Sequence, residues 1–254
     1  MSKRVVIGFS LAALVLMGAE SVFAQSSKAA WRFKELIDLA SAAANPANPG
    51  STTPNDTGWV TILTTQIKTP NAKELAIGVS LQCGLVTDTT VRSKGGELDS
   101  AAAQSRIKVQ VKITQPDGSE VLAQPSNGRD LEEVLLDADT GVTYCDRFQK
   151  LAARFSGLNC TAGDDGAVTC ADPEELQLIL KTMTVHHFNF LHANAIPGVQ
   201  KVEVQARAQS AVALDGTKLG AAGTAAFAGA GALSVETIRL IKDVNGTVDL
   251  ENLR

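Results

Sequence analysis

The stretch LQLILKTMTVHHFNFLHANAIPGVQKVEVQARAQ, residues 176–209, has the clearest alternation of polar and apolar residues in the chain. Successive side chains of a β-strand point to opposite faces of a sheet, so this pattern predicts strands. Ile-Pro-Gly at 196–198 is a turn signal. We therefore predict three strands, over 176–180, over 185–192 and from Val199 onward. The third has one charged and one small apolar face, which favours an antiparallel sheet.

Shorter alternating segments surround this stretch. Residues 106–114, RIKVQVKIT, carry Ile and Val on one face and Arg, Lys and Gln on the other, and QPDGS at 115–119 is typical of a hairpin turn. Gly84 is expected to interrupt another strand as a bulge or tight bend. Many short strands without a βαβ rhythm predict an all-β, two-sheet antiparallel sandwich, with jelly-roll-like topology preferred and immunoglobulin-like topology as the alternative.

The N-terminal part has a different composition. Residues 1–24 carry two basic residues near their start, Lys3 and Arg4, continue with an apolar run and end in Val-Phe-Ala, the small-x-small pattern of a cleaved signal peptide. Residues 25–57 are expected to form a short helix over 28–44, where apolar residues recur at i, i+3 and i+4, and then a Pro/Asn-rich linker. The β-sandwich domain is expected to cover 58–254.

Export and charge limit the partners. The signal peptide predicts a secreted or periplasmic protein, and no second apolar run is long enough for a transmembrane span after signal cleavage. Removal of Lys3, Arg4 and Glu20 with the signal peptide changes the formal net charge from −4 to −5. A mildly acidic chain without long charge runs is not suited to nucleic acid. The expected partner is a protein, a glycan or an envelope component.

Four cysteines in an exported chain indicate disulfides. Cys160 and Cys170 flank a turn rich in Gly and Asp and are expected to close it, and a Cys83–Cys145 bond then follows by elimination. A four-thiolate zinc site is the alternative, but the chain has no Cys-x-x-Cys pair of the kind that such sites use.

The three histidines lie in the opening stretch, but strand geometry separates them. His186 and His192 share the face that carries the Phe side chains, about 20 Å apart at the rise of a strand, whereas His187 points the other way. One metal ion therefore cannot bind all three on an unbroken strand. His187 with carboxylates from another strand is the remaining candidate for a metal site or an active site.

Two acidic turns are candidates for calcium. Asp137 and Asp139 lie in one, and Asp164 and Asp165 in the other, but neither has the full spacing of a calcium loop. No cofactor is therefore expected, with calcium as the alternative. Catalytic sequence motifs such as Gly-x-Ser-x-Gly are absent from the mature chain. The sequence favours an exported, non-catalytic binding or structural module over an enzyme or metal-binding protein with a site near His187.

Overall fold

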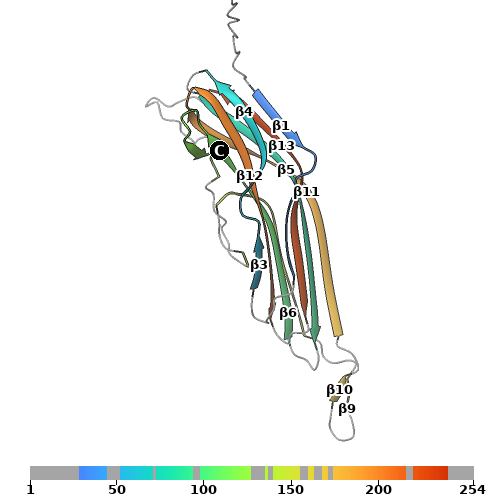
Figure 1. The fold of residues 1–254 in the computed structure, drawn as a ribbon. Coiled ribbons are helices and arrows are strands. Elements are labelled where there is room, and N and C mark those ends of the chain that lie inside the picture. Colours follow the sequence, from blue (N-terminus) through green and yellow to red (C-terminus); the bar gives the residue numbers. More distant parts are fainter. Residues whose placement is uncertain are drawn as a thin grey trace, which may run out of the picture.

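The protein is all-β in the parts of the chain that the structure, a computed structural model, describes. These parts are residues 29–44, 52–70, 73–93, 98–126, 135–136, 140–154, 160–162, 168–170, 174–215 and 220–239. They form two packed antiparallel sheets and a two-stranded ribbon, and they contain no helix (Figure 1). The predicted all-β sandwich with antiparallel sheets is confirmed.

Sheet A has five strands in the order β1-β13-β5-β11, and β2 also pairs with β13. All of its pairs are antiparallel. The strand β11 forms one edge of this sheet (Figure 1). The bounds are Ala29–Lys34 for β1, Leu39–Ala44 for β2, Lys73–Ser93 for β5, Glu174–Ala195 for β11 and Ala221–Ile238 for β13.

Sheet B has six strands in the order β3-β12-β6-β7, with β4 also pairing with β12 and β8 with β6. A ribbon of β9 and β10 projects beyond the end of the two sheets (Figure 1). The bounds are Thr52–Asp56 for β3, Val60–Thr69 for β4, Leu98–Thr114 for β6, Glu120–Leu122 for β7, Val142–Arg154 for β8, Cys160–Ala162 for β9, Val168–Cys170 for β10 and Gly198–Asp215 for β12.

The helix predicted over 28–44 is wrong. This segment contains β1 and β2, which pair with opposite ends of β13. The alanines that suggested a helix alternate in burial along β2, where Leu39, Ser41 and Ala43 are buried and the residues between them are exposed. Pairing with β13 therefore outweighs the helical propensity of the segment. The predicted linker also contains a strand, β3, so the sheets are not confined to residues 58–254.

The stretch 176–209 forms two strands instead of three. The strand β11 continues through Lys181–Thr184, where a break was expected, because it pairs with β5 along almost its whole length. The turn at 196–198 is confirmed: β11 ends at Ala195 and β12 begins at Gly198. The hairpin turn at 115–119 is also confirmed by hydrogen bonds between Gln115 and both Gly118 and Ser119.

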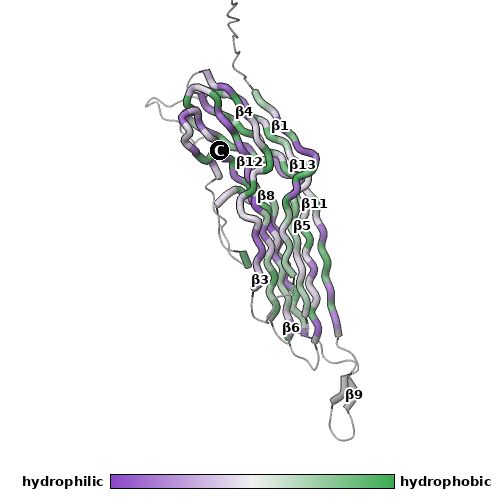
Figure 2. The backbone as a smooth tube through the Cα atoms, viewed as in Figure 1, coloured by the Kyte–Doolittle hydropathy of each residue, from purple (hydrophilic) through white to green (hydrophobic). Residues whose placement is uncertain are grey.

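Aliphatic side chains from both sheets form the main core. Figure 2 shows hydrophilic and hydrophobic residues alternating along β12, and the hydrophobic set lies on the face toward sheet A. The apolar residues of 106–114 on β6 also face this core, as their alternation predicted. The fully buried members of this core include Leu75, Ile77, Val79 and Leu81 of β5, Ile107, Val109, Val111 and Ile113 of β6, Val202, Val204, Ala206 and Ala208 of β12, and Leu233 and Val235 of β13.

The outward face of sheet B is partly covered as well. Arg106 and Lys108 of β6 point away from the core, as predicted, yet both side chains are fully buried. The backbone N–H groups of Leu135 and Leu136 donate to Oε1 of Gln104 on this face. Leu135 and Leu136 therefore lie over this side of β6, and Arg106 and Lys108 beside Gln104 are buried.

Candidate functional site

The structure separates the three histidines of β11, as strand geometry predicted. His187 lies on the outward face of sheet A, while His186 and His192 lie on the face toward sheet B. Each has its own surroundings. The described part of the chain contains no group of three or more His, Cys, Asp or Glu residues that could hold a metal ion.

His187 makes the most chemically suggestive contacts of the three. It lies opposite Ser80 of β5, with Ser80 Oγ 2.8 Å from its Nδ1. Its Nε2 is 3.0 Å from Oδ1 of Asn189, two residues along β11. Both contacts are satisfied together when the proton is on Nε2, because Nε2–H then donates to Asn189 while Nδ1 accepts from the Ser80 hydroxyl. Ser80, His187 and Asn189 thus form one hydrogen-bonded row.

No described carboxylate accompanies His187. Asp137, Asp139, Asp164 and Asp165, the predicted acidic ligands, lie outside the described residues. The calcium alternative and any link between these residues and His187 therefore stay predictions.

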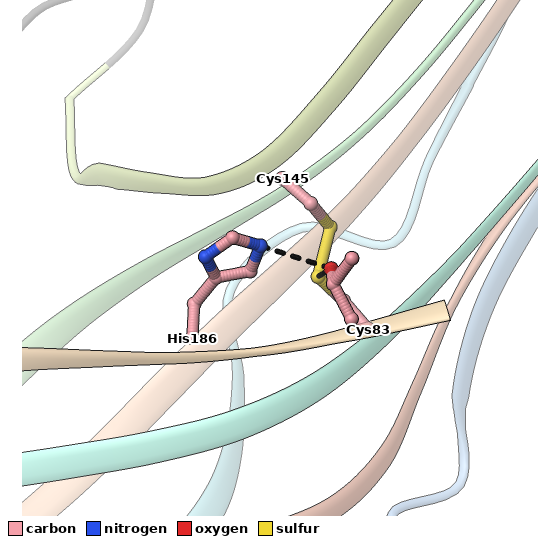
Figure 3. The surroundings of a disulfide bond; sticks show 4 residues. Cys83, Cys145 and His186 are labelled. Carbon is pink, nitrogen blue, oxygen red and sulfur yellow. Dashed lines mark hydrogen bonds between the residues drawn. A yellow bond between two sulfur atoms is a disulfide. The ribbon is translucent and has the colours of Figure 1, made fainter. Parts of the chain in front are cut away.

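His186 lies beside the disulfide that joins the two sheets. Cys83 of β5 is bonded to Cys145 of β8, which confirms this predicted pair. Nε2 of His186 is 2.9 Å from the Thr184 hydroxyl, which in turn is 3.7 Å from Sγ of Cys83 (Figure 3). A bulge in β8 helps to form this connection, since Tyr144 is the extra residue there and donates its hydroxyl proton to the Val79 carbonyl. The arrangement is a covalent and hydrogen-bonded tie between the sheets.

The other predicted disulfide would join the two strands of the ribbon. Cys160 of β9 and Cys170 of β10 are directly opposite each other in the antiparallel register. This backbone pairing matches the predicted turn closed at its base, and the bond itself stays a prediction.

His192 is buried, with 9% of its surface exposed, and its Nε2 has no hydrogen-bond partner. Burial lowers the pKa of this imidazole below the ordinary value of 6.5, because the charged form loses its hydration. Burial therefore favours the neutral form of the His192 imidazole.

The outward face of sheet A forms a trough with large side chains along its borders. Trp31 and Phe33 of β1 are 70% and 73% exposed and form one wall. The register places Phe33 in one row with Ala232, Ser80 and His187. A parallel row runs from Trp31 through Ser234 and Gly78 to Asn189. Three strand spacings, or about 14 Å, separate β1 at this wall from β11 at the opposite border.

Small residues make the floor of the trough. An added Cβ at Gly78 would lie 2.6 Å from the Ser234 hydroxyl, so glycine leaves room for that side chain on the outward face. A groove of about 410 Å³ occupies the end of the trough nearest Val185, which is 68% exposed. Its lining combines apolar and polar groups: Phe33, Lys34, Glu35, Ser80, Leu81, Gln82, Val185, Ala230, Gly231 and Ala232. The site is thus an open, mainly apolar surface with polar groups at one side.

The aromatic wall is the feature that sequence reasoning missed. The predicted helix over 28–44 placed Trp31 and Phe33 outside the sandwich, so the sequence did not predict them as part of a binding surface. Their i, i+2 spacing, which puts both rings on one face of a strand, is the signal that could have revealed them.

No protein-family model matches the chain, and no curated protein is detectably similar to it. Among solved structures, VP2 of infectious bursal disease virus in a subviral particle is 13% identical with a TM-score of 0.23, over 84% of this chain and 42% of that chain. The structure of the Gx strain of the same virus gives 10% identity and a TM-score of 0.16, over 84% and 41%. This chain thus spans about two fifths of those chains, and scores this low carry no argument about fold or function. Among the described residues, no helix is long and apolar enough to cross a membrane.

Proposed function

We propose that this protein is an exported, non-catalytic β-sandwich with a binding or structural role in the cell envelope or extracellular space. The N-terminal sequence supports export, and the Cys83–Cys145 disulfide is a bond typical of oxidising compartments. We also propose the jelly-roll-like arrangement as the topology of the sandwich.

The trough on sheet A is the observation that carries this proposal. Exposed aromatic side chains cost solubility and are enriched at recognition surfaces, so two of them side by side on one strand indicate a contact surface. Small floor residues leave room for an extended ligand, and Ser80, His187 and Asn189 offer hydrogen bonds along the opposite border. These features suit a protein segment, a glycan or another envelope polymer.

A paired-substitution experiment tests the binding role. The double variant Trp31→Ser, Phe33→Ser removes the aromatic wall, and Leu36→Ser is a matched control because Leu36 is equally exposed, at 73%, but does not line the trough. We expect the purified protein to bind the polysaccharide, protein or lipid fraction of isolated cell envelopes. The double variant should lose at least about tenfold in affinity for that fraction, equivalent to about 1.4 kcal/mol, while the control should not. Equal binding by all three proteins, or none by the wild type, contradicts the proposal.

A hydrolytic enzyme is the second candidate, favoured by the row of Ser80, His187 and Asn189. A histidine that accepts from a serine hydroxyl and is oriented by an asparagine has the arrangement of an activated nucleophile. It ranks second because Ser80 lies on a strand paired on both sides, so ladder bonds engage its backbone groups. The open surface also lacks the water-excluded setting in which oxyanion stabilisation is strong.

Ester hydrolysis separates the two candidates. An enzyme should hydrolyse an activated aryl ester, and both Ser80→Ala and His187→Ala should reduce kcat/KM by at least about a hundredfold. A binding protein should show no rate that depends on either residue, and the same two variants should remain folded.

A further inference from the structure

The open edge of sheet A lies along β11. This strand pairs with β5 on one side, and on the other side the one backbone pairing among the described residues is an isolated bridge between Leu191 and Gln124. In that bridge, the N–H and C=O of Leu191 both bond to Gln124, at 2.8 Å each. The backbone N–H and C=O groups of Leu191 therefore point away from β5.

The side to which the N–H and C=O groups of Leu191 point also gives the side to which those of every second residue along β11 point. In an antiparallel ladder, alternate residues direct their N–H and C=O groups to the same side, and the β11–β5 register has no shift before His192. The backbone groups of every second residue from Glu175 to Asn189 thus face the open edge. No described strand accepts them.

The side chains of this edge are as open as its backbone. All residues from Glu175 to Asn189 are exposed except Thr182 and Thr184, which are half-buried. Natural edge strands are usually protected by prolines, bulges or several lysines, but this run has no proline and one lysine, Lys181. Large apolar side chains are exposed on both of its faces: Leu176, Leu178, Ile179, Leu180, Met183, Val185 and Phe188.

We propose that β11 pairs antiparallel with β11 of a second copy of this chain, which joins two A sheets into one continuous sheet. The run from Glu175 to Asn189 has its midpoint at Thr182. A two-fold axis at Thr182 places each edge-facing residue opposite another edge-facing residue, so the complete free edge is hydrogen-bonded in both copies.

The residue order is self-complementary in this register. On the outward face, Ile179 of one copy lies opposite Val185 of the other, and on the inward face Leu176 lies opposite Phe188. Glu175 lies opposite Asn189 and Lys181 lies opposite Met183, so no two like charges are directly opposite each other in this register. Cross-strand apolar pairs stabilise a sheet, and like charges placed opposite each other destabilise it. This complementarity favours a second copy over an unrelated strand. The contact is separate from the aromatic wall of the trough.

Sedimentation of the processed, exported protein tests the pairing. We expect a concentration-dependent dimer between about 1 and 100 µM. Val185→Lys puts a charge on the edge and should raise the dimer Kd at least about thirtyfold, or about 2 kcal/mol. Val60→Lys is the matched control, because Val60 is an exposed valine on β4 of the other sheet, and it should leave the Kd unchanged. A wild-type monomer over this whole range, or a dimer that Val185→Lys leaves intact, overturns the proposal.

Spin labels determine the register without a disruptive substitution. Around an axis at Thr182, labels at Lys181 in the two copies are two positions apart, about 7 Å along the strands, and labels at Gln177 are ten positions apart, about 34 Å. Strong dipolar broadening at Lys181 with a separation near 34 Å at Gln177 is expected. Labels that show no coupling at either site in a dimeric sample overturn the pairing, whether or not Val185→Lys folds. Trough binding with a monomeric protein would contradict this proposal alone.

Discussion

The ring of Phe227 in β13 lies directly over Gly84, its register partner in β5. The strand β5 passes through Gly84 without the bulge or tight bend that glycine suggested, because the glycine makes room for an aromatic side chain on the outward face. A small residue in one strand and a large one in the next thus form a single packing unit.

Gly84→Ala should destabilise the protein by about 1–3 kcal/mol, since its Cβ would overlap the Phe227 ring. Chemical denaturation provides the measurement. Gly223→Ala is the matched control: an added Cβ there meets nothing within 4 Å, so stability should stay the same or rise slightly. A second substitution, Phe227→Leu, should recover part of the loss, and a double variant with simply additive losses contradicts the packing.

Removal of the bond between the sheets should have a larger effect. The double variant Cys83→Ala, Cys145→Ala opens a loop with a sequence separation of 62 residues, for which the chain-entropy model gives about 4 kcal/mol. The denaturation midpoint of the wild type should therefore fall toward that of the variant when reductant is added. The corresponding Cys160→Ala, Cys170→Ala variant changes only the β9–β10 ribbon and should shift the denaturation midpoint little. Equal shifts in both variants would contradict the view that Cys83–Cys145 holds the sandwich together.

Asp56 and Arg207 form an ion pair at the edge of sheet B, and it should make stability depend on pH. Burial by itself would raise the pKa of Asp56, but hydrogen bonds from Arg207, the Gly58 N–H and Gln209 outweigh it and hold the pKa below its usual 3.8. A lowered carboxyl pKa stabilises the folded state above the unfolded value, and this stabilisation is lost as pH falls through the folded value. Asp56→Asn should cost about 1 kcal/mol near pH 7.

The difference between wild type and Asp56→Asn should shrink as pH falls below about 3.8, because both side chains are then neutral. Urea denaturation over this range measures the difference. A gap that stays constant with pH would show that the carboxylate charge is not the source of the effect.

His192 should make the stability of the folded protein depend on pH just below neutral. Its folded pKa is lowered by burial, so the unfolded chain takes up a proton first as pH falls below about 6.5, and the folded state loses stability. His192→Leu replaces the imidazole with an apolar side chain of similar size and removes this proton uptake. Denaturation midpoints should therefore fall less between about pH 7 and pH 5 in the variant than in the wild type. Parallel curves would contradict the burial of a neutral imidazole.

Alternation revealed the sheets where each strand has one apolar face and one polar face. Residues 106–114 and the strand after Gly198 are such cases, and their faces were predicted correctly. The N-terminal segment was predicted wrongly, because an alanine-rich sequence fits a helix locally and only its pairing with β13 makes it a strand. The length of β11 was missed because its apolar residues do not follow one buried face: many of them are exposed at the sheet edge.

The candidate site was predictable only in part. Strand periodicity was sufficient to separate His186, His187 and His192, and parity put His187 on the outward face. The pairing of β11 with β5 that brings Ser80 to His187 is a contact between residues 107 positions apart, which a single sequence does not encode locally. The aromatic wall depends on the same kind of long-range pairing.

Amide hydrogen exchange along β11 tests the central claim most directly. At low concentration, the amides of Leu176, Leu178 and Leu180 should be protected by β5, and those of Ile179, Lys181 and Met183 should exchange fast because they face the open edge. At high concentration the second set should become protected, as the edge pairs with another copy. Fast exchange of the second set in a sample that sedimentation shows to be dimeric would contradict the account.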